Sequence, residues 1–504
     1  MKRLAYGNTS LLFLASAVVC LAIADTAVSA LDPWAELSRL AGGILNPEFL
    51  AVEARSVVLT VAFAVVGVAI AAGTGFLLAI VYPLSAAVRR TAMVLRSVHE
   101  LFWALLLIQV FGLGATTGLL AIALPYSGVF AKVFAEMIEE ADLAAVKVLP
   151  AGTSAVSAFA YARLPEVAER FKTYTLYRLE CGLRSTLVLG FVGLPTVGFH
   201  LESYFKQGHY AEAAALLAVF YVLIGTRRLW VRPSTLPALL IGSLFVLPET
   251  MGGGSAWTNL MRFVTHDIVP SPLRGGDVTA SGTWAGLWEW FWPILTGKIA
   301  PGIWHTLVLA QIALVAMGLL ALMLFPLVSR RFAGRIGQAG GSALLVVVRS
   351  TPEYALAYVL LQLLGPSMLP AIIALAVHNA GIVGYLMGRH ADALDYRPDA
   401  PSGVNLYAYE AVPRLYGQFL AYMLYRWEII VRESAIFGIL GVATLGYHVD
   451  AAISELRFDV AVVMIVATVL VSAAIDSLSR WLRRSLQISA LPTRLADAPA
   501  EKIA

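Results

Sequence analysis

Charge is what this sequence most lacks. Only 13% of its 504 residues are Asp, Glu, Lys or Arg, whereas soluble globular chains carry roughly 25%. Hydrophobic residues make up 59% of the chain, so a water-soluble fold of this length is excluded for want of polar surface. The net charge is only +4, and the basic residues lie between apolar runs rather than in one patch, which argues against a nucleic-acid partner.

Cysteine is also scarce, and the common catalytic and nucleotide-binding motifs are missing. Cys20 and Cys181 lie in apolar stretches, and no His or Cys stands near them at metal-ligand spacing, so no metal site is predicted. The glycine-rich GRIGQAGGS at 334–342 has no lysine to reach a phosphate, and no GxSxG motif occurs. We therefore expect neither an enzyme nor a cofactor in this chain, and any ATP and Mg²⁺ to bind a separate subunit.

Long apolar runs are what the sequence has in abundance. Runs of about 18 or more residues recur along it, the length that crosses a bilayer core as a helix. Hydropathy predicts an all-α, polytopic membrane protein with about 12 transmembrane helices. The predicted spans lie near residues 10–31, 55–83, 97–117, 119–139, 172–195, 210–226, 233–249, 303–327, 346–365, 368–388, 416–446 and 459–479.

The basic residues between the spans predict the orientation. With the N-terminus in the cytoplasm, most Lys and Arg of the connecting segments also fall on the cytoplasmic side, as the positive-inside rule requires. This indicates a multi-pass protein of the inner membrane with both termini cytoplasmic. The first apolar run is long enough to be a retained signal anchor, and a cleaved signal peptide is the alternative. The orienting residues include Arg89, Arg90, Arg163, Arg170, Lys172, Arg227, Arg228, Arg232, Arg330, Arg331, Arg335, Arg480, Arg483 and Arg484.

An internal repeat divides the chain. LRSVHELFWALLLIQVFGLG from Leu95 matches VRSTPEYALAYVLLQLLG from Val348 at an offset of 253, and TYTLYRLECGLRST from Thr173 matches AYMLYRWEIIVRES from Ala421 at an offset of 248. Two halves of like orientation suggest a pathway between them. The predicted domains are a first half at 1–232, a second half at 233–488 with a periplasmic insert at about 250–302, and a cytoplasmic tail at 489–504.

Charged residues fall at the start of the third span of each half. Glu100 lies four residues after Arg96, and Glu353 lies four residues after Arg349, which predicts that each pair shares one helix face. One interpretation is an ion pair at the helix end that fixes register. The other is a gate, or a contact that senses motor subunits.

A second set of charges lies inside the fifth predicted span of each half. A charge at the centre of a membrane helix costs roughly 2.5–3.5 kcal/mol, so these residues need a wet cavity, a partner charge or the membrane edge. They either line a path for a compact anion or form a buried Arg–Glu network that holds the halves together. The residues are Arg178, Glu180 and Arg184 in the first copy, and Arg426, Glu428 and Arg432 in the second.

These motifs resemble a known family. The RS-x-x-E block, the G-x-x-x-K/Y span and the YRxE-x-x-x-R block follow one another as in the permease subunits of bacterial phosphonate ABC importers, over roughly 53–225 and 300–482. Members of that family are commonly single units that pair, and this chain looks like two such units fused, with two type I halves. The resemblance implies import of phosphonate, phosphite or a related oxyanion, two copies of a cytoplasmic ABC ATPase, a periplasmic substrate-binding protein, and surrounding membrane lipid.

The resemblance also implies a cytoplasmic coupling loop between the fourth and fifth spans. In the first half Gly152, Leu164 and Pro165 match its pattern, while Val146 stands at the Glu position. In the second half Pro413 remains, Ala400 replaces the Gly, and the loop is five residues shorter. Two rival interpretations stay open: a self-contained secondary transporter with parallel repeats, and a degenerate permease that acts as a scaffold.

Overall fold

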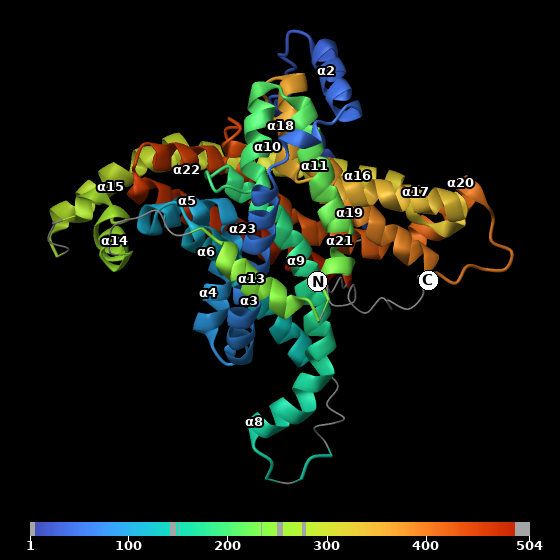
Figure 1. Ribbon diagram of the computed structural model, residues 1–504, viewed down its shortest axis with the longest axis horizontal. Helices are drawn as coiled ribbons and strands as arrows, with labels where there is room; N and C mark the ends of the chain where they lie inside the picture. Colours follow the sequence, from blue (N-terminus) through green and yellow to red (C-terminus); the bar gives the residue numbers. More distant parts are fainter. Residues whose placement is uncertain are drawn as a thin grey trace. The chain divides into compact units, whose positions relative to one another are not determined.

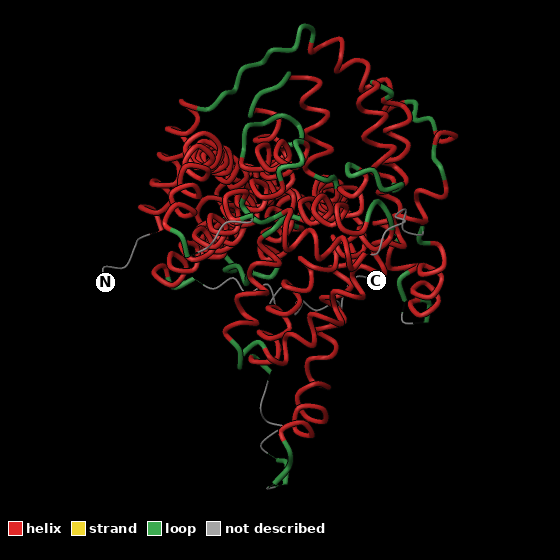
Figure 2. The backbone as a smooth tube through the Cα atoms, turned by 90° about the vertical axis from the view of Figure 1, so that its left-hand side faces the viewer, coloured by secondary structure: helices red, strands yellow, loops and turns green. Residues whose placement is uncertain are grey.

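The computed structural model describes residues 6–141, 148–150, 152–232, 234–248, 256–274 and 279–488. Across these residues the chain forms helices joined by loops, with no strand (Figure 2). The predicted all-α class is confirmed for this part of the chain.

Among the residues that the structure describes, six helices are long and apolar enough to cross a membrane, and the number rises to 8 if each of two bent helix pairs is one span. This supports a multi-pass membrane protein. The four other predicted spans correspond to two long but polar helices at Leu164–Gly190 and Val412–Glu433, and to two short apolar helices at Tyr210–Gly225 and Leu236–Val246. The count of 12 spans therefore stays a prediction.

The helices form two compact units, whose elements are labelled in Figure 1. Among the described residues, unit 1 holds 6–47, 205–214 and 261–488, and unit 2 holds 48–204 and most of 215–260. These units are groups of packed helices, so they do not test the boundary of the sequence repeat at 232, which stays a prediction.

Unit 2 contains the first copy of the repeated motifs. Its helices α3 and α6 pack most closely, and α4, α5 and α9 lie against this pair. The elements are η1 (Phe49–Ala51), α3 (Ala54–Val81), α4 (Ala86–Ser97), α5 (Glu100–Phe111), α6 (Ala115–Glu139), α8 (Ala155–Ala158), η2 (Phe159–Arg163), α9 (Leu164–Gly190), most of α10 (Val197–Gln207) and of α11 (Tyr210–Gly225), α12 (Arg227–Trp230), α13 (Leu236–Val246) and α14 (Ala256–Arg262).

Unit 1 contains the second copy, and its closest pair is α16 and α19. The elements are α1 (Tyr6–Ile23), α2 (Pro33–Leu45), η3 (Phe263–Asp267), η4 (Ser271–Leu273), α15 (Ser281–Ile294), η5 (Leu295–Ile299), α16 (Ala300–Val328), α17 (Arg330–Ser350), α18 (Glu353–Leu364), α19 (Leu369–Asp392), α20 (Gly403–Leu406), η6 (Tyr407–Ala411), α21 (Val412–Glu433), η7 (Ser434–Gly438), α22 (Leu445–Ser454) and α23 (Phe458–Leu486).

The chain bends sharply at or near the start of the third predicted span of each half. α4 and α5 meet at 96°, and α17 and α18 meet at 87°. In unit 1 the cause is Pro352, which has no N–H to donate and forces Thr351 into extended backbone at φ −67°, ψ 120°. In unit 2 His99 takes the place of proline with nearly the same backbone angles, and its Nδ1 accepts the Leu101 N–H at 3.2 Å, which caps α5.

A glycine of the G-x-x-x-K/Y motif sets how closely these broken helices pass over the next one. A Cβ on Gly128 would lie 2.5 Å from the Ala92 carbonyl oxygen, and a Cβ on Gly381 would lie 2.8 Å from a Val348 methyl group. Only glycine allows backbones to approach this closely. The motif therefore places the end of α4 on α6 and the end of α17 on α19.

Candidate functional site

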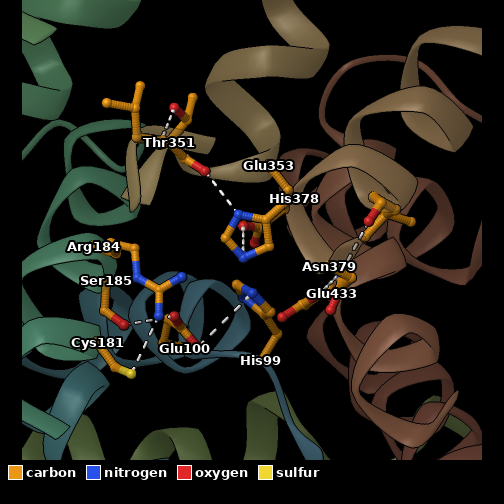
Figure 3. A network of polar contacts seen from close by, with 12 residues as sticks. His99, Glu100, Cys181, Arg184, Ser185, Thr351, Glu353, His378, Asn379 and Glu433 are labelled. Carbon is orange, nitrogen blue, oxygen red and sulfur yellow. Dashed lines mark hydrogen bonds and ion pairs between the residues drawn. The ribbon is translucent and has the colours of Figure 1, made fainter. Parts of the chain in front are cut away.

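Each unit places a carboxylate directly after its helix break. In unit 2, Glu100 is the first residue of α5, accepts a hydrogen bond from the Ser185 hydroxyl at 2.8 Å, and lies 3.8 Å from His99 Nε2 (Figure 3). Because Ser185 belongs to α9, the RS-x-x-E block and the YRxE-x-x-x-R helix meet at this carboxylate. The Tyr126 hydroxyl of α6 lies 3.0 Å from the Ser185 hydroxyl and extends the network.

In unit 1 the corresponding carboxylate, Glu353, has a histidine from a different element. His378 of α19 places Nε2 3.8 Å from the Glu353 carboxylate, and its Nδ1 donates to the Thr351 carbonyl at 2.8 Å (Figure 3). The neighbouring Asn379 amide donates to Glu433 of α21 at 3.1 Å. Both units thus pair the glutamate after the break with a histidine, although the histidines do not occupy equivalent positions.

The structure corrects one expectation about these glutamates. Arg96 lies in the last turn of α4 and Glu100 begins α5, so the sharp bend separates them. Arg349 and Glu353 are divided in the same way between α17 and α18. The prediction that each pair shares one helix face is therefore wrong. The guanidinium of Arg349 also lies 4.7 Å from the ring centre of Tyr385.

The glutamate of the first YRxE block has a partner that the sequence did not indicate. Glu180 of α9 is buried and forms an ion pair with Arg227 at the start of α12. Arg184, one turn further along α9, donates to the Cys181 sulfur at 3.2 Å. Because Arg227 follows α11 closely, this ion pair ties α9 to the end of α11.

Arg178 of the same block lies among tyrosines. Its Nε donates to the Tyr174 hydroxyl at 2.9 Å, and its guanidinium lies 5.4 Å from the ring centres of Tyr126 and Tyr174 and 6.0 Å from that of Tyr177. Stacking on rings and a neutral hydroxyl partner hold the cation inside the unit without a carboxylate.

The second copy of the block is arranged differently. In α21, Glu428 is buried, Arg426 and Arg432 are half-buried, and Glu433 accepts the bond from Asn379. The Tyr422 hydroxyl lies 2.7 Å from His390 Nε2. The two copies therefore share a sequence pattern but not a set of contacts.

The predicted coupling loops both lead into a π turn before a proline. The turn is η2 in unit 2 and η6 in unit 1, and each ends just before the first residue of the long helix, Leu164 or Val412. Pro165 and Pro413 stand next, where a missing N–H and the proline ring disfavour an ordinary α turn. α8 and the start of α9 project away from the other helices of their unit, at the bottom of Figure 1.

The helix of each coupling segment begins soon after the predicted Gly position. Gly152 has φ +93°, and the Ser154 side chain caps α8 by accepting the Ser157 N–H. Ala400 lies in a turn, and Gly403 at φ +61° begins α20. Val146, the departure from the family pattern, lies outside the described residues.

A repeated apolar pair in these segments escaped the sequence reasoning. Val156 and Tyr161 in the first segment are 78% and 82% exposed, and Val404 and Tyr409, at the same offset of 248, are 80% and 77% exposed. Comparing SAVSAFAYARLP with SGVNLYAYEAVP would have found them. Because the same apolar side chains are exposed in both copies, these positions are candidates for a contact surface.

Ion pairs and ring contacts hold the second coupling segment. The Glu410 side chain is buried, and its carboxylate accepts a hydrogen bond from Arg397 Nε at 2.7 Å. The Arg414 guanidinium lies 3.7 Å from the same carboxylate. Arg414 and Arg331 both lie about 6 Å from the Tyr396 ring centre, at 5.9 and 5.8 Å. Burial and then the nearby Asp392 raise the pKa of Tyr396, so the ring stays neutral beneath these cations. The shorter loop is therefore held by charge and ring contacts.

Comparison with known proteins gives several relatives. The chain is 27% identical to the phosphate-import permease protein PhnE of Mycolicibacterium smegmatis, over 78% of this chain and 76% of that protein. It is 32% identical to the phosphite transport system permease protein PtxC of Stutzerimonas stutzeri, over 39% of this chain and 76% of PtxC. A protein of Escherichia coli named as a cryptic phosphonate transport system permease, PhnE2, is 28% identical over 21% of this chain and 88% of its own length. No protein-family model and no solved structure matches the chain.

Proposed function

Because the chain belongs to the family of phosphonate and phosphite transport permeases, we propose that it is the transmembrane subunit of an ATP-driven ABC importer. Its cargo would be phosphonate, phosphite or a related oxyanion, delivered at the outer face by a periplasmic binding protein. The protein would lie in the bacterial inner membrane with both termini in the cytoplasm.

One observation carries this proposal. The alignment with a transport permease extends over 78% of the chain, more than either half could supply, so it reaches into both halves. A relative of about half this length aligns with 39% of the chain. This supports two permease-like halves in one polypeptide.

The translocation path would use the charges that the repeat duplicates. Buried or half-buried Arg and Glu at the helix breaks and on α9 and α21 supply a field that can admit a compact anion while side chains of opposite sign keep the protein stable. The candidates are Arg96, Glu100, Glu180, Arg184, Arg349, Glu353, Arg426, Glu428 and Arg432, whereas Arg178 is already enclosed by tyrosine rings.

The coupling segments would be the part of this chain that a bound ATPase moves. Each exposes a valine just before the π turn and a tyrosine within it, and each continues directly into the long helix that carries the YRxE block. A rigid helix transmits displacement, so movement of a bound ATPase would be passed to the charged residues of α9 and α21. Two copies of an ATPase, one for each segment, would hold the ATP and Mg²⁺, and this chain would hold no cofactor.

The experiment is reconstitution with and without the motor. The chain is purified with its co-expressed ATPase and placed in liposomes, and uptake of radiolabelled phosphite, phosphate and methylphosphonate is measured with loaded binding protein outside and ATP inside. ATP-dependent uptake of one of these anions supports the proposal. Uptake by the chain alone would instead indicate a secondary transporter, and no binding-protein stimulation of ATP hydrolysis would indicate a scaffold.

A further inference from the structure

The two copies of one arginine are held differently. Arg178 is enclosed by tyrosine rings and bonded to the Tyr174 hydroxyl at 2.9 Å. Arg426 stands at the equivalent place in α21 and is half-buried. It makes no hydrogen bond, ion pair or ring contact with any residue that the structure describes. Its environment therefore leaves a cation to be satisfied by something else.

A substitution in α19 removes one ring from Arg426. Asn379 occupies the place that Tyr126 has in the first copy, and its amide is engaged with Glu433 at 3.1 Å. The ring that lies 5.4 Å from the Arg178 guanidinium therefore has no counterpart beside Arg426.

The other two tyrosines each contact a residue other than Arg426. His390 replaces Met137 of the first copy, and it engages the Tyr422 hydroxyl at 2.7 Å, so this hydroxyl is not bonded to Arg426 as that of Tyr174 is to Arg178. The ring centre of Tyr425 lies 6.0 Å from the guanidinium of Arg483, and Tyr425 makes no ring contact with Arg426. These exchanges together leave Arg426 without the enclosure of its counterpart.

Arg426 lies within the packed part of its helix rather than at the helix end. Tyr422, Arg426 and Glu433 follow at i, i+4 and i+11 and so share a face of α21. Tyr422 meets His390 and Glu433 meets Asn379, both on α19, a helix apolar enough to span the membrane. An unpaired charge between these two contacts is costly unless an anion or water reaches it.

We propose that Arg426 is the arginine that contacts the oxyanion in transit, whereas Arg178 is a structural residue. This rests on the proposed import function and makes the path asymmetric, with one cation from the second copy. A guanidinium presents two parallel N–H groups, which match two oxygens of a tetrahedral phosphorus oxyanion. The Nε–H of Arg178 is already taken by the Tyr174 hydroxyl, so this donor is lost to an anion, and tyrosine rings lie against the rest of the group.

The test measures transport and ATP hydrolysis by the complete system with radiolabelled phosphite and phosphate. Arg426→Ala is expected to lower uptake per molecule about tenfold or more, because a charged hydrogen-bond partner is lost. ATP hydrolysis stimulated by loaded binding protein should remain, because the coupling segments are intact. Arg426→Lys should retain an intermediate rate, because the charge remains while the rigid pair of parallel N–H groups is lost.

The matched control is Arg178→Ala, which should lower the melting temperature while uptake per folded molecule stays within about threefold. A second variant tests the same inference while Arg426 itself is kept. His390→Met frees the Tyr422 hydroxyl to accept from Arg426, as Tyr174 does from Arg178, and should lower uptake. His390→Met combined with Tyr422→Phe should restore it.

The outcomes separate the two proposals. Full uptake by Arg426→Ala in a system whose unaltered form transports would overturn this inference and leave the importer function standing. No uptake of any phosphorus oxyanion by the unaltered system would overturn the function and this inference with it.

Discussion

The ion pair between Glu180 and Arg227 gives a stability prediction of definite size. Replacing Glu180 by Gln keeps the shape of the side chain and leaves Arg227 without its carboxylate. Removing one partner of a buried pair costs about 3–5 kcal/mol. Because 27% of the Arg227 side chain is exposed and can turn toward water, we place the loss near the lower end, at about 3 kcal/mol. For a compact unit of this size, that lowers the melting temperature by roughly 6–12 °C.

The assay is thermal unfolding of the purified full chain in detergent, followed with a thiol-reactive dye. Cys181 is buried and becomes reactive on unfolding, and Cys20→Ser removes the other thiol. The matched control is Glu169→Gln, whose partner Lys172 is 3.1 Å away but whose side chain is 80% exposed, so a shift of only a degree or two is expected. Glu180→Gln combined with Arg227→Gln should recover part of the loss. A Glu180→Gln shift no larger than the control, or strictly additive single changes, would refute the reasoning.

Three further outcomes follow from the repeated elements. Tyr161→Asp and Tyr409→Asp change exposed side chains, so the melting temperature should be unchanged. ATP hydrolysis stimulated by the binding protein should fall several-fold. A parallel fall in melting temperature and in ATP hydrolysis would point to misfolding. Gly381→Ala places a methyl group 2.8 Å from a Val348 methyl and should cost about 1–3 kcal/mol in the thermal assay, whereas Gly340→Ala, with open space around it, should cost nothing. His99→Pro should stay within about 1 kcal/mol, because His99 already has the backbone angles of Pro352, whereas His99→Gly should unfold several degrees earlier.

The positions of the long helices could be predicted from the sequence because burial in lipid demands apolar length. All twelve predicted spans correspond to helical segments, but the broken spans could not be placed from hydropathy. Val98 and Thr351 are ordinary helix residues by composition, and only their neighbours, the capping His99 and the following Pro352, end the helix there. The predicted span 416–446 is also too long, since α21 ends at Glu433 and a 3₁₀ turn follows.

The charged residues were found by sequence, but their partners were not. The sequence left Arg178, Glu180 and Arg184 as either an anion path or an Arg–Glu network. In the structure, Glu180 pairs with Arg227 from a distant segment. Such a contact depends on how α11 ends beside α9, which no local pattern encodes. The histidines beside Glu100 and Glu353 stand at unlike positions of the sequence, so no spacing indicates them, and only packing shows that each lies 3.8 Å from its carboxylate.

The unequal surroundings of Arg178 and Arg426 have a consequence for how such a protein can vary. In a symmetric dimer of one shorter chain, every substitution occurs twice, so a tyrosine that encloses one guanidinium must enclose both. With both copies of the block in a single polypeptide, a position in one copy can change while its counterpart does not. Asn379 and His390 are such differences, which a homodimer could not carry in one subunit only. Under the proposed function, engineering of cargo preference would be confined to one copy while the other is left to keep the fold.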